Sequence, residues 1–184
     1  MSDPGKANRG PGAAAENRAA LVRAAREVFA ADGLGAPLSS VARRAGVGQG
    51  SLYRHFPDRI SLALAVFDDN MVELDALAAT GEASLDEVLA MLTRHVIAST
   101  AFVEMLGTAA DDPRVAEVAA RVEQIVAAAL PAARTAGRVR ADLETDDVLL
   151  AIGMLAGILA RFPIDERADA AERAWALLDR AIRP

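Results

Sequence analysis

The chain has 184 residues, which is enough for one or two domains with a buried core. It contains no cysteine, so disulfide bonds, thiolate nucleophiles and cysteine-ligated metals are excluded. The net charge of −6 at first argues against a nucleic-acid partner, but this charge is unevenly distributed. Residues 1–60 hold nine basic and five acidic side chains, a net charge of +4, whereas residues 61–184 hold eleven and twenty-one, a net charge of −10. A basic N-terminal part on an acidic body concentrates attraction for phosphate at one end.

Hydrophobic residues make up 53% of the chain and aromatic residues only 4%, so the core consists of Ala, Leu and Val. This composition favours helices, and we expect an all-α fold of about nine helices. The longest apolar run, residues 148–162, is too short to span a bilayer, and the N-terminus lacks the hydrophobic segment of a signal peptide. We therefore expect a cytoplasmic protein without membrane contact, cofactor or metal.

The first predicted elements are an arm and a helix. Residues 1–14 are rich in Gly, Pro and small side chains, which predicts a disordered N-terminal arm. Residues 16–31 predict a helix, because apolar side chains recur at helical spacing from Leu21 to Phe29. The dipeptide Asp32-Gly33 ends this helix.

Two short helices joined by a glycine turn are predicted between residues 38 and 59. Ser39 and Ser40 are suited to capping the first helix, which Gly46 ends in a left-handed conformation. The second helix runs over residues 48–56, and Pro57 stops it. Asp58 then caps the following helix.

The second of these helices carries two kinds of side chain on two faces. Leu52 and Phe56 are four residues apart, so they share one face and are buried together. The remaining surface is polar and has no carboxylate, and its side chains can reach base edges or phosphates: Gln49, Gly50, Ser51, Tyr53, Arg54 and His55. This spacing is typical of a helix-turn-helix with its second helix in the major groove, and an ordinary helical hairpin is the alternative.

Residues 46–59, Gly-Val-Gly-Gln-Gly-Ser-Leu-Tyr-Arg-His-Phe-Pro-Asp-Arg, resemble the recognition-helix signature of the tetracycline-repressor (TetR) family of bacterial regulators. The resemblance covers residues 16–70. Two positions differ from many relatives, which carry threonine or serine in place of Leu38 and lysine in place of Arg59. The resemblance implies a helix-turn-helix domain over residues 15–60 and a helical effector-binding and dimerisation domain over residues 61–184.

The resemblance also gives the candidate DNA contacts. We expect Gln49, Gly50 and Ser51 to face base edges, with Gln49 suited to a bidentate contact with adenine. The candidates for phosphate contacts are Tyr53, His55 and Arg59, followed by Ser39, Arg44 and Arg54. His55 alternatively caps a local carbonyl. Lys6, Arg9 and Arg18 either touch the duplex backbone or remain solvated surface groups.

Five more helical segments follow in the body. Residues 58–79 form a long apolar helix, which in the family links the DNA-binding domain to the body. Ser84 and Glu87 form a capping box for a helix that runs to Leu106, with an interruption at residues 107–108. The next helix begins at Pro113 and ends at Gly137, with a kink or boundary at Pro131.

The last two predicted helices cover residues 146–162, with Thr145 as the cap, and residues 165–182. The first of them is apolar almost all round, so every face requires cover. In the family, the last two helices of two subunits pack as a four-helix bundle. We therefore expect a homodimer through Leu149, Gly153, Leu155, Gly157, Trp175 and Leu178.

An effector pocket is expected inside the body, on the basis of the resemblance alone. Its candidate lining residues, each of which is alternatively plain core, are Met71, Met91, His95, Ser99, Phe102, Met105 and Met154. The predicted function is a regulator, typically a repressor, that binds double-stranded palindromic DNA as a homodimer and is released by an effector. A helical ligand-binding or scaffold protein without operator binding is the alternative. An enzyme is disfavoured, because the sequence has no phosphate loop or paired carboxylate motif.

Overall fold

The computed structural model describes residues 11–184, and this part of the chain is helical without any strand. In chain order its elements are α1 (Pro11–Asp32), α2 (Leu38–Ala45), α3 (Gln49–His55), α4 (Arg59–Ala78), α5 (Leu85–Ala98), α6 (Ala101–Thr108), α7 (Pro113–Thr135), α8 (Thr145–Leu159), a 3₁₀ turn (Ile164–Glu166) and α9 (Arg167–Ile182). Lys6 and Arg9 lie outside the described residues.

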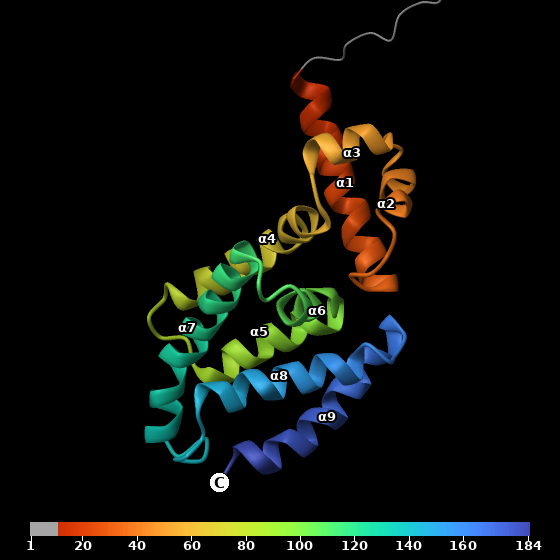
Figure 1. Cartoon of the computed structure of the whole chain (residues 1–184). Coiled ribbons are helices and arrows are strands. Elements are labelled where there is room, and N and C mark those ends of the chain that lie inside the picture. Colours follow the sequence, from red (N-terminus) through yellow and green to blue (C-terminus); the bar gives the residue numbers. More distant parts are fainter. Residues whose placement is uncertain (1–10) are drawn as a thin grey trace, which may run out of the picture.

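The first three helices form a small head at one end of the molecule (Figure 1). α1 packs along α2, and α3 contacts both. The core of the head consists of apolar side chains with at most 2% of their surface exposed: Leu21, Phe29, Val41, Leu52 and Phe56. Gly46 ends α2 with a φ of +66°, as predicted, so the chain turns sharply into α3.

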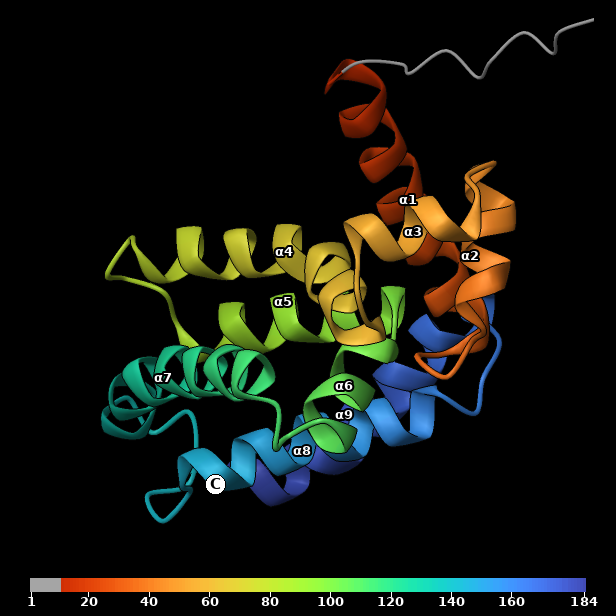
Figure 2. The same cartoon turned by 45° about the horizontal axis from the view of Figure 1, so that its top comes forward.

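The remaining helices form the body, which α4 joins to the head (Figure 2). α5 lies in the middle of the body and packs against α4, α7, α8 and α9. α8 and α9 run side by side as a helical hairpin in both views. Among the described residues no single helix is long and apolar enough to cross a membrane, although α5 and α6 together, bent by 98°, have the length and composition.

Two predicted helix caps are confirmed. Asp58 accepts a hydrogen bond from the backbone N–H of Ser61 at 2.6 Å, and the Ser61 hydroxyl lies 3.3 Å from the Asp58 nitrogen. Ser84 and Glu87 form the same reciprocal arrangement at the start of α5, with distances of 2.9 and 3.3 Å. Each pair satisfies two backbone donors that the first turn of a helix otherwise leaves unpaired.

The structure corrects three predicted helix starts. α1 begins at Pro11 and so includes the last part of the predicted arm, because the alanines before Glu16 continue the helix. α2 begins at Leu38, and Pro37 is its N-cap residue. The two predicted caps, Ser39 and Ser40, therefore lie inside the first turn of the helix. There the Ser40 hydroxyl donates to the Pro37 carbonyl at 2.6 Å. α8 begins at Thr145 and is capped by Glu144.

Two predicted interruptions are also corrected. The chain breaks at Ser99 and Thr100, not at residues 107–108, because Ser99 is extended and its hydroxyl accepts the backbone N–H of Ala101 at 3.3 Å. Residues 107–108 instead lie at the end of α6. α7 continues through Pro131, so the boundary predicted there is absent, whereas the alternative of a kink stays a prediction. Buried side chains on both sides of the proline hold the helix against the body.

Candidate nucleic-acid interface

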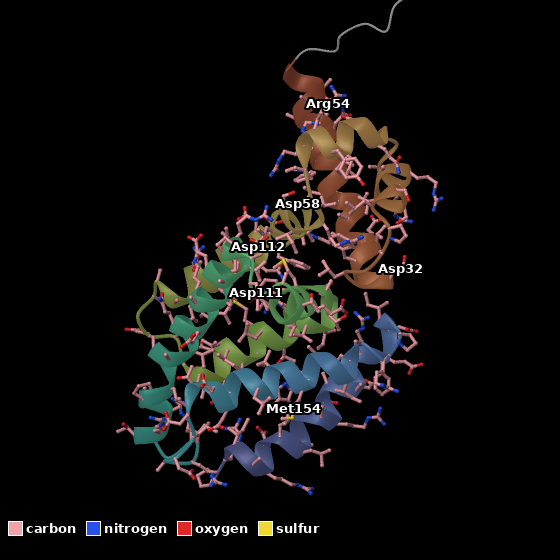
Figure 3. All side chains as sticks on the ribbon, in the orientation of Figure 1. Asp32, Arg54, Asp58, Asp111, Asp112 and Met154 are labelled. Carbon is pink, nitrogen blue, oxygen red and sulfur yellow. The ribbon has the colours of Figure 1, made fainter. Side chains whose placement is uncertain are left out.

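α3 presents a polar outer face and an apolar inner face. Leu52 and Phe56 are buried in the head, whereas Tyr53 has 52% of its surface exposed. Gln49, Gly50 and Arg54 are exposed as well, and Ser51 and His55 are half-buried. Arg54 lies at the end of the head that is remote from the body (Figure 3). No other part of residues 11–184 therefore covers the outer face of the helix that the sequence assigns to the major groove.

Local hydrogen bonds set the position of α3. After Gly46, the backbone N–H of Val47 donates to the Ala42 carbonyl at 3.0 Å and closes the end of α2. The Arg54 guanidinium donates to the Gly50 carbonyl at 3.1 Å along the outer face of α3. A Cβ at Gly50 would meet no neighbouring atom of the described residues within 4 Å, so the packing of this part of the chain does not require glycine there.

Three arginines near α3 are already engaged within the chain. Arg44 forms an exposed ion pair with Glu27, and the Arg18 guanidinium lies 5.2 Å from the centre of the Phe56 ring. Arg59 donates two hydrogen bonds, to the carbonyls of Leu34 and Ala36. The Arg59 guanidinium therefore holds the loop between α1 and α2, and the phosphate contact expected of this residue stays a prediction.

The head contacts the body at three further places. On α1, Arg26 donates to the Val66 carbonyl at 3.0 Å and to the Asp69 carboxylate at 2.6 Å, both on α4. On α6, Glu104 accepts the backbone N–H of Leu34 at 2.9 Å. A side chain at position 33 would bring its Cβ within 3.2 Å of the Glu104 carboxylate, and Gly33 also has a φ of +76°. Glycine at this position therefore permits the close approach of α6 to the head.

The third contact joins α7 to the start of α4. Arg114 at the beginning of α7 pairs with Asp58 at 3.0 Å and with Asp112 at 2.7 Å. Hydrogen bonds from the Ser61 backbone and from Arg114 lower the pKa of Asp58, and the Arg114 side chain lowers the pKa of Asp112 to about 2. The three labelled residues near this point, Asp58, Asp111 and Asp112, lie where the head meets the body in Figure 3.

Of the residues predicted to line an effector pocket, Met71, His95, Ser99, Phe102 and Met105 are buried on α4, α5 and α6 or at the break between them. Met91 is half-buried on α5. The Phe102 ring packs against Phe67 at 5.1 Å.

Met154 does not belong to this group, because it is 51% exposed on the outer side of α8. A hollow of about 500 Å³ between α5 and α9 is lined by a different set: Asp86, Leu89, Ala90, Thr93, Arg94, Ile97, Trp175, Asp179 and Arg183. Within the described residues no group of three or more His, Asp or Glu side chains could hold a metal ion.

The predicted dimer residues divide into two groups. Gly157 is exposed, and Leu149, Gly153 and Leu178 are half-buried. Leu155 is fully buried in its own chain, and the Trp175 indole turns toward α5, where it donates to the Thr93 hydroxyl at 2.9 Å. The burial of Leu155 contradicts its assignment to the interface, because helical periodicity alone does not show which apolar face a neighbouring helix covers. Trp175 is half-buried, and its interface role stays a prediction.

The exposed apolar side chains on this hairpin were not assigned to the dimer interface from the sequence. Leu150, Met154 and Ile158 are 61%, 51% and 42% exposed and follow one another at intervals of four residues along α8. Leu177 on α9 is 66% exposed. The three residues on α8 share an i, i+4, i+8 spacing. This spacing could have identified them as one exposed stripe, if the opposite face of the helix had been assigned to the core.

A three-helix head with an outward polar α3, carried on a helical body, defines a helix-turn-helix protein. Residues 21–66 match the family described as bacterial regulatory proteins, tetR family. The crystal structure of the TetR transcriptional regulator SCO0520 from Streptomyces coelicolor is similar, with 31% identity, coverage of 91% of this chain and 98% of that chain, and a TM-score of 0.53.

A TetR regulatory protein from Mycobacterium vanbaalenii shows 28% identity, with 94% and 98% of the two chains covered and a TM-score of 0.52. A γ-butyrolactone receptor described as ArpA-like shares the fold at 21% identity, with 94% and 90% covered and a TM-score of 0.60. No curated protein sequence matches the chain. The chain belongs to the TetR family and is a DNA-binding transcriptional regulator.

Proposed function

We propose that this regulator is a repressor that binds a palindromic operator as a homodimer in the cytoplasm and leaves it when a small-molecule effector binds. The observation that carries this proposal is the polar, carboxylate-free outer face of α3, which the other described residues leave uncovered. A helix with these groups can enter the major groove without bringing a negative charge toward the phosphates.

The contacts with DNA are divided by their chemistry. The Gln49 amide at the start of α3 offers one donor and one acceptor, the pair that adenine matches in the major groove. The Tyr53 hydroxyl, one turn further on the exposed face, donates to a phosphate. Gln49 therefore affects which sequence is bound, and Tyr53 affects how tightly any sequence is bound.

Dimerisation is supported by the uncovered apolar face of the α8–α9 hairpin. Leu150, Met154 and Ile158 form a stripe along α8 that a monomer leaves in water. A Cβ at Gly153 or Gly157 would meet no neighbouring atom of residues 11–184 within 4 Å, so packing within this part of the chain does not require glycine there. Close approach of a second chain gives a reason for the small residues. Two heads related by a twofold axis would then meet half-sites one helical turn apart.

Release by an effector is supported by the joints between body and head. The loop between α1 and α2 is bound from α4 by Arg59 and from α6 by Glu104. A ligand that moves α4 or α6 would therefore change the position of the head and with it the spacing of the two recognition helices. The γ-butyrolactone receptor with the same fold gives a precedent for small-molecule reception in this arrangement of helices.

The test begins with selection of bound DNA from a random pool by the full-length protein. We expect a palindromic motif, and a mobility shift whose affinity falls steeply with salt. Tyr53→Phe should weaken binding about tenfold on every sequence, because one hydrogen bond to a charged acceptor is lost. Gln49→Ala should change the base preferred at one position of each half-site.

Gln124→Ala, an exposed glutamine on α7, is the matched control and should leave both properties unchanged. The proposal is wrong if the pool yields no palindrome, or if the two α3 variants bind as the control does.

A further inference from the structure

The hollow of about 500 Å³ between α5 and α9 has no part in the mechanism proposed above. Its described lining contains no residue of α8, although α8 packs against both helices, so the hollow lies in the outer groove between α5 and α9. The lining also contains none of the residues predicted for the effector pocket. Sites for small molecules have volumes of roughly 300–1,000 Å³. The hollow is therefore large enough for a small molecule and is formed by a different set of residues.

Two contacts across the hollow fix the register of its walls. The Trp175 indole donates to the Thr93 hydroxyl at 2.9 Å, and Asp86 pairs with Arg183 at 3.2 Å. The partners on α9 move backward along the chain as those on α5 move forward, so the two helices are antiparallel. The α9 side of the lining consists of Trp175, Asp179 and Arg183, which follow one another at intervals of four residues and share one face. The hollow therefore runs lengthwise between the two helices.

The hollow and the exposed apolar side chains of the hairpin lie on different sides of α9. Leu177 is 66% exposed and is two residues from both Trp175 and Asp179. A step of two residues turns a helix by about 200°, so Leu177 points away from the hollow. The exposed stripe along α8 is also absent from the described lining. A dimer formed through these apolar side chains would therefore leave the hollow open.

The charged side chains around the hollow compensate one another. Arg183 pairs with Asp86 and with Asp179, at 3.2 Å in each case. Arg94 pairs with Glu73 on α4 at 3.0 Å. Every charged residue of the described lining thus has a partner of opposite sign. A charged ligand would find no unpaired counter-charge there, so the lining favours a neutral molecule.

One hydrogen-bonding group in the lining is only half used. The Thr93 hydroxyl accepts the Trp175 N–H, and a hydroxyl can also donate one proton. Within residues 11–184 this hydroxyl forms no further hydrogen bond. Leu89, Ile97 and Trp175 give the same lining an apolar surface, and Thr93 and Trp175 are half-buried between the helices. The walls therefore combine an apolar surface with a donor that lacks an acceptor.

We propose that this hollow binds a neutral ring compound that carries one hydrogen-bond acceptor, such as a ketone oxygen. The Thr93 hydroxyl donates to that oxygen while it accepts from the Trp175 indole. The ring lies against Leu89, Ile97 and Trp175, because a flat apolar skeleton buries most of its surface on aromatic and aliphatic side chains. The site goes beyond the proposed function, since it lies outside the predicted effector pocket and binding there requires no DNA.

The chain contains one tryptophan, so Trp175 reports directly on the hollow. Full-length protein labelled with 5-fluorotryptophan gives a single ¹⁹F resonance, and its shift is followed during titration with 1-indanone, indane and indane-1-carboxylate. We expect 1-indanone to bind about fivefold more tightly than indane, which lacks the acceptor. It should bind about tenfold more tightly than the carboxylate, whose charge has no partner in the lining.

Variants on α5 separate the hydrogen bond from the shape of the hollow. Thr93→Val should weaken 1-indanone about fivefold and leave indane unchanged, because only the ketone uses the hydroxyl. Thr93→Ser keeps the hydroxyl and should bind both probes as wild type does. Ala90→Phe adds bulk at an exposed position of the lining and should weaken both probes about tenfold. Ala127→Phe, at an exposed position of α7 outside the lining, is the matched control.

Several outcomes would overturn the inference. They are an unchanged resonance with 1-indanone, equal affinities of ketone and hydrocarbon, and equal affinities of Ala90→Phe and its control. If Thr93→Val weakens both probes equally, the hydroxyl only supports the indole and the assigned hydrogen bond is wrong. If Thr93→Val does not fold, the three probes on wild type and the Ala90→Phe variant decide.

Probe affinity that falls as the protein concentration rises would show that a second subunit fills the hollow, which also contradicts the inference. None of these measurements includes DNA. Failure of probe binding therefore leaves the proposed function intact, and failure of operator binding leaves this site intact.

Discussion

Replacing Glu104 with alanine should loosen the head from the body. The Glu104 carboxylate accepts hydrogen bonds from the Leu34 backbone at 2.9 Å and from the Thr100 hydroxyl at 3.1 Å. Both donor residues are buried, with 7% and 3% of their surfaces exposed, so water replaces the lost acceptor poorly. A buried donor left unpaired costs about 1–3 kcal/mol. For the two donors together we expect a loss of about 2–3 kcal/mol in the free energy of unfolding.

For a chain of this size about 1 kcal/mol shifts the melting temperature by roughly 2–4 °C, so the expected decrease is about 4–12 °C. Thermal and urea unfolding measure it, and hydrogen exchange should show faster exchange of the Leu34 amide. Glu104→Gln should lose less, because its carbonyl oxygen still accepts the Leu34 N–H. Glu117→Ala, an exposed acid on α7, is the matched control. If Glu104→Ala melts as the control does and the Leu34 amide stays protected, the proposed link between α6 and the head is wrong.

Three further predictions use the same preparations. Arg59→Ala should destabilise the protein by about 1–3 kcal/mol, because two loop carbonyls lose their donor, whereas Arg54→Ala should leave the melting temperature nearly unchanged and weaken operator binding. Equal melting temperatures of wild type and Arg59→Ala would show that these two hydrogen bonds do not stabilise the loop. Leu150→Asp should convert a dimer into a folded monomer in analytical ultracentrifugation, and a dimer that survives would place the interface elsewhere. Because Arg114 lowers the pKa of Asp112 to about 2, Asp112 should add stability above pH 4 that is lost as the pH falls toward 2. Asp112→Asn should make the unfolding free energy less dependent on pH in that window, and an unchanged pH dependence would contradict the assignment.

Sequence reasoning succeeded where a local rule decides the outcome. Gly46 ends α2 because only a residue without a side chain takes a left-handed conformation at no steric cost. Asp58 and Ser84 cap helices because their oxygens lie within reach of a backbone N–H two or three residues on. The buried and exposed faces of α3 follow from the four-residue spacing of Leu52 and Phe56.

Sequence reasoning failed where tertiary contacts choose between equivalent faces. α8 is apolar nearly all round, so its pattern gives no basis for deciding that Leu155 faces the core and Leu150 faces outward. The break at Ser99 lies inside an apolar run without glycine or proline, and the side-chain bond from Ser99 to Ala101 becomes visible only in three dimensions. The bonds from Arg59 to two loop carbonyls were also missed, because these partners lie about 25 residues earlier in the chain.

Two contacts between head and body show how a movement of the body would reach the head. Arg59 donates to two backbone carbonyls in the loop between α1 and α2, and Glu104 accepts the backbone N–H of Leu34 in the same loop. A tilt of α4 changes the first contact, and a shift of α6 changes the second. Because the two contacts share a single loop, their effects on head position should be coupled, not additive. A double variant, Arg59→Ala with Glu104→Ala, should therefore lose a different amount of stability from the sum of the single losses, and additivity would mean that the two helices hold the head independently.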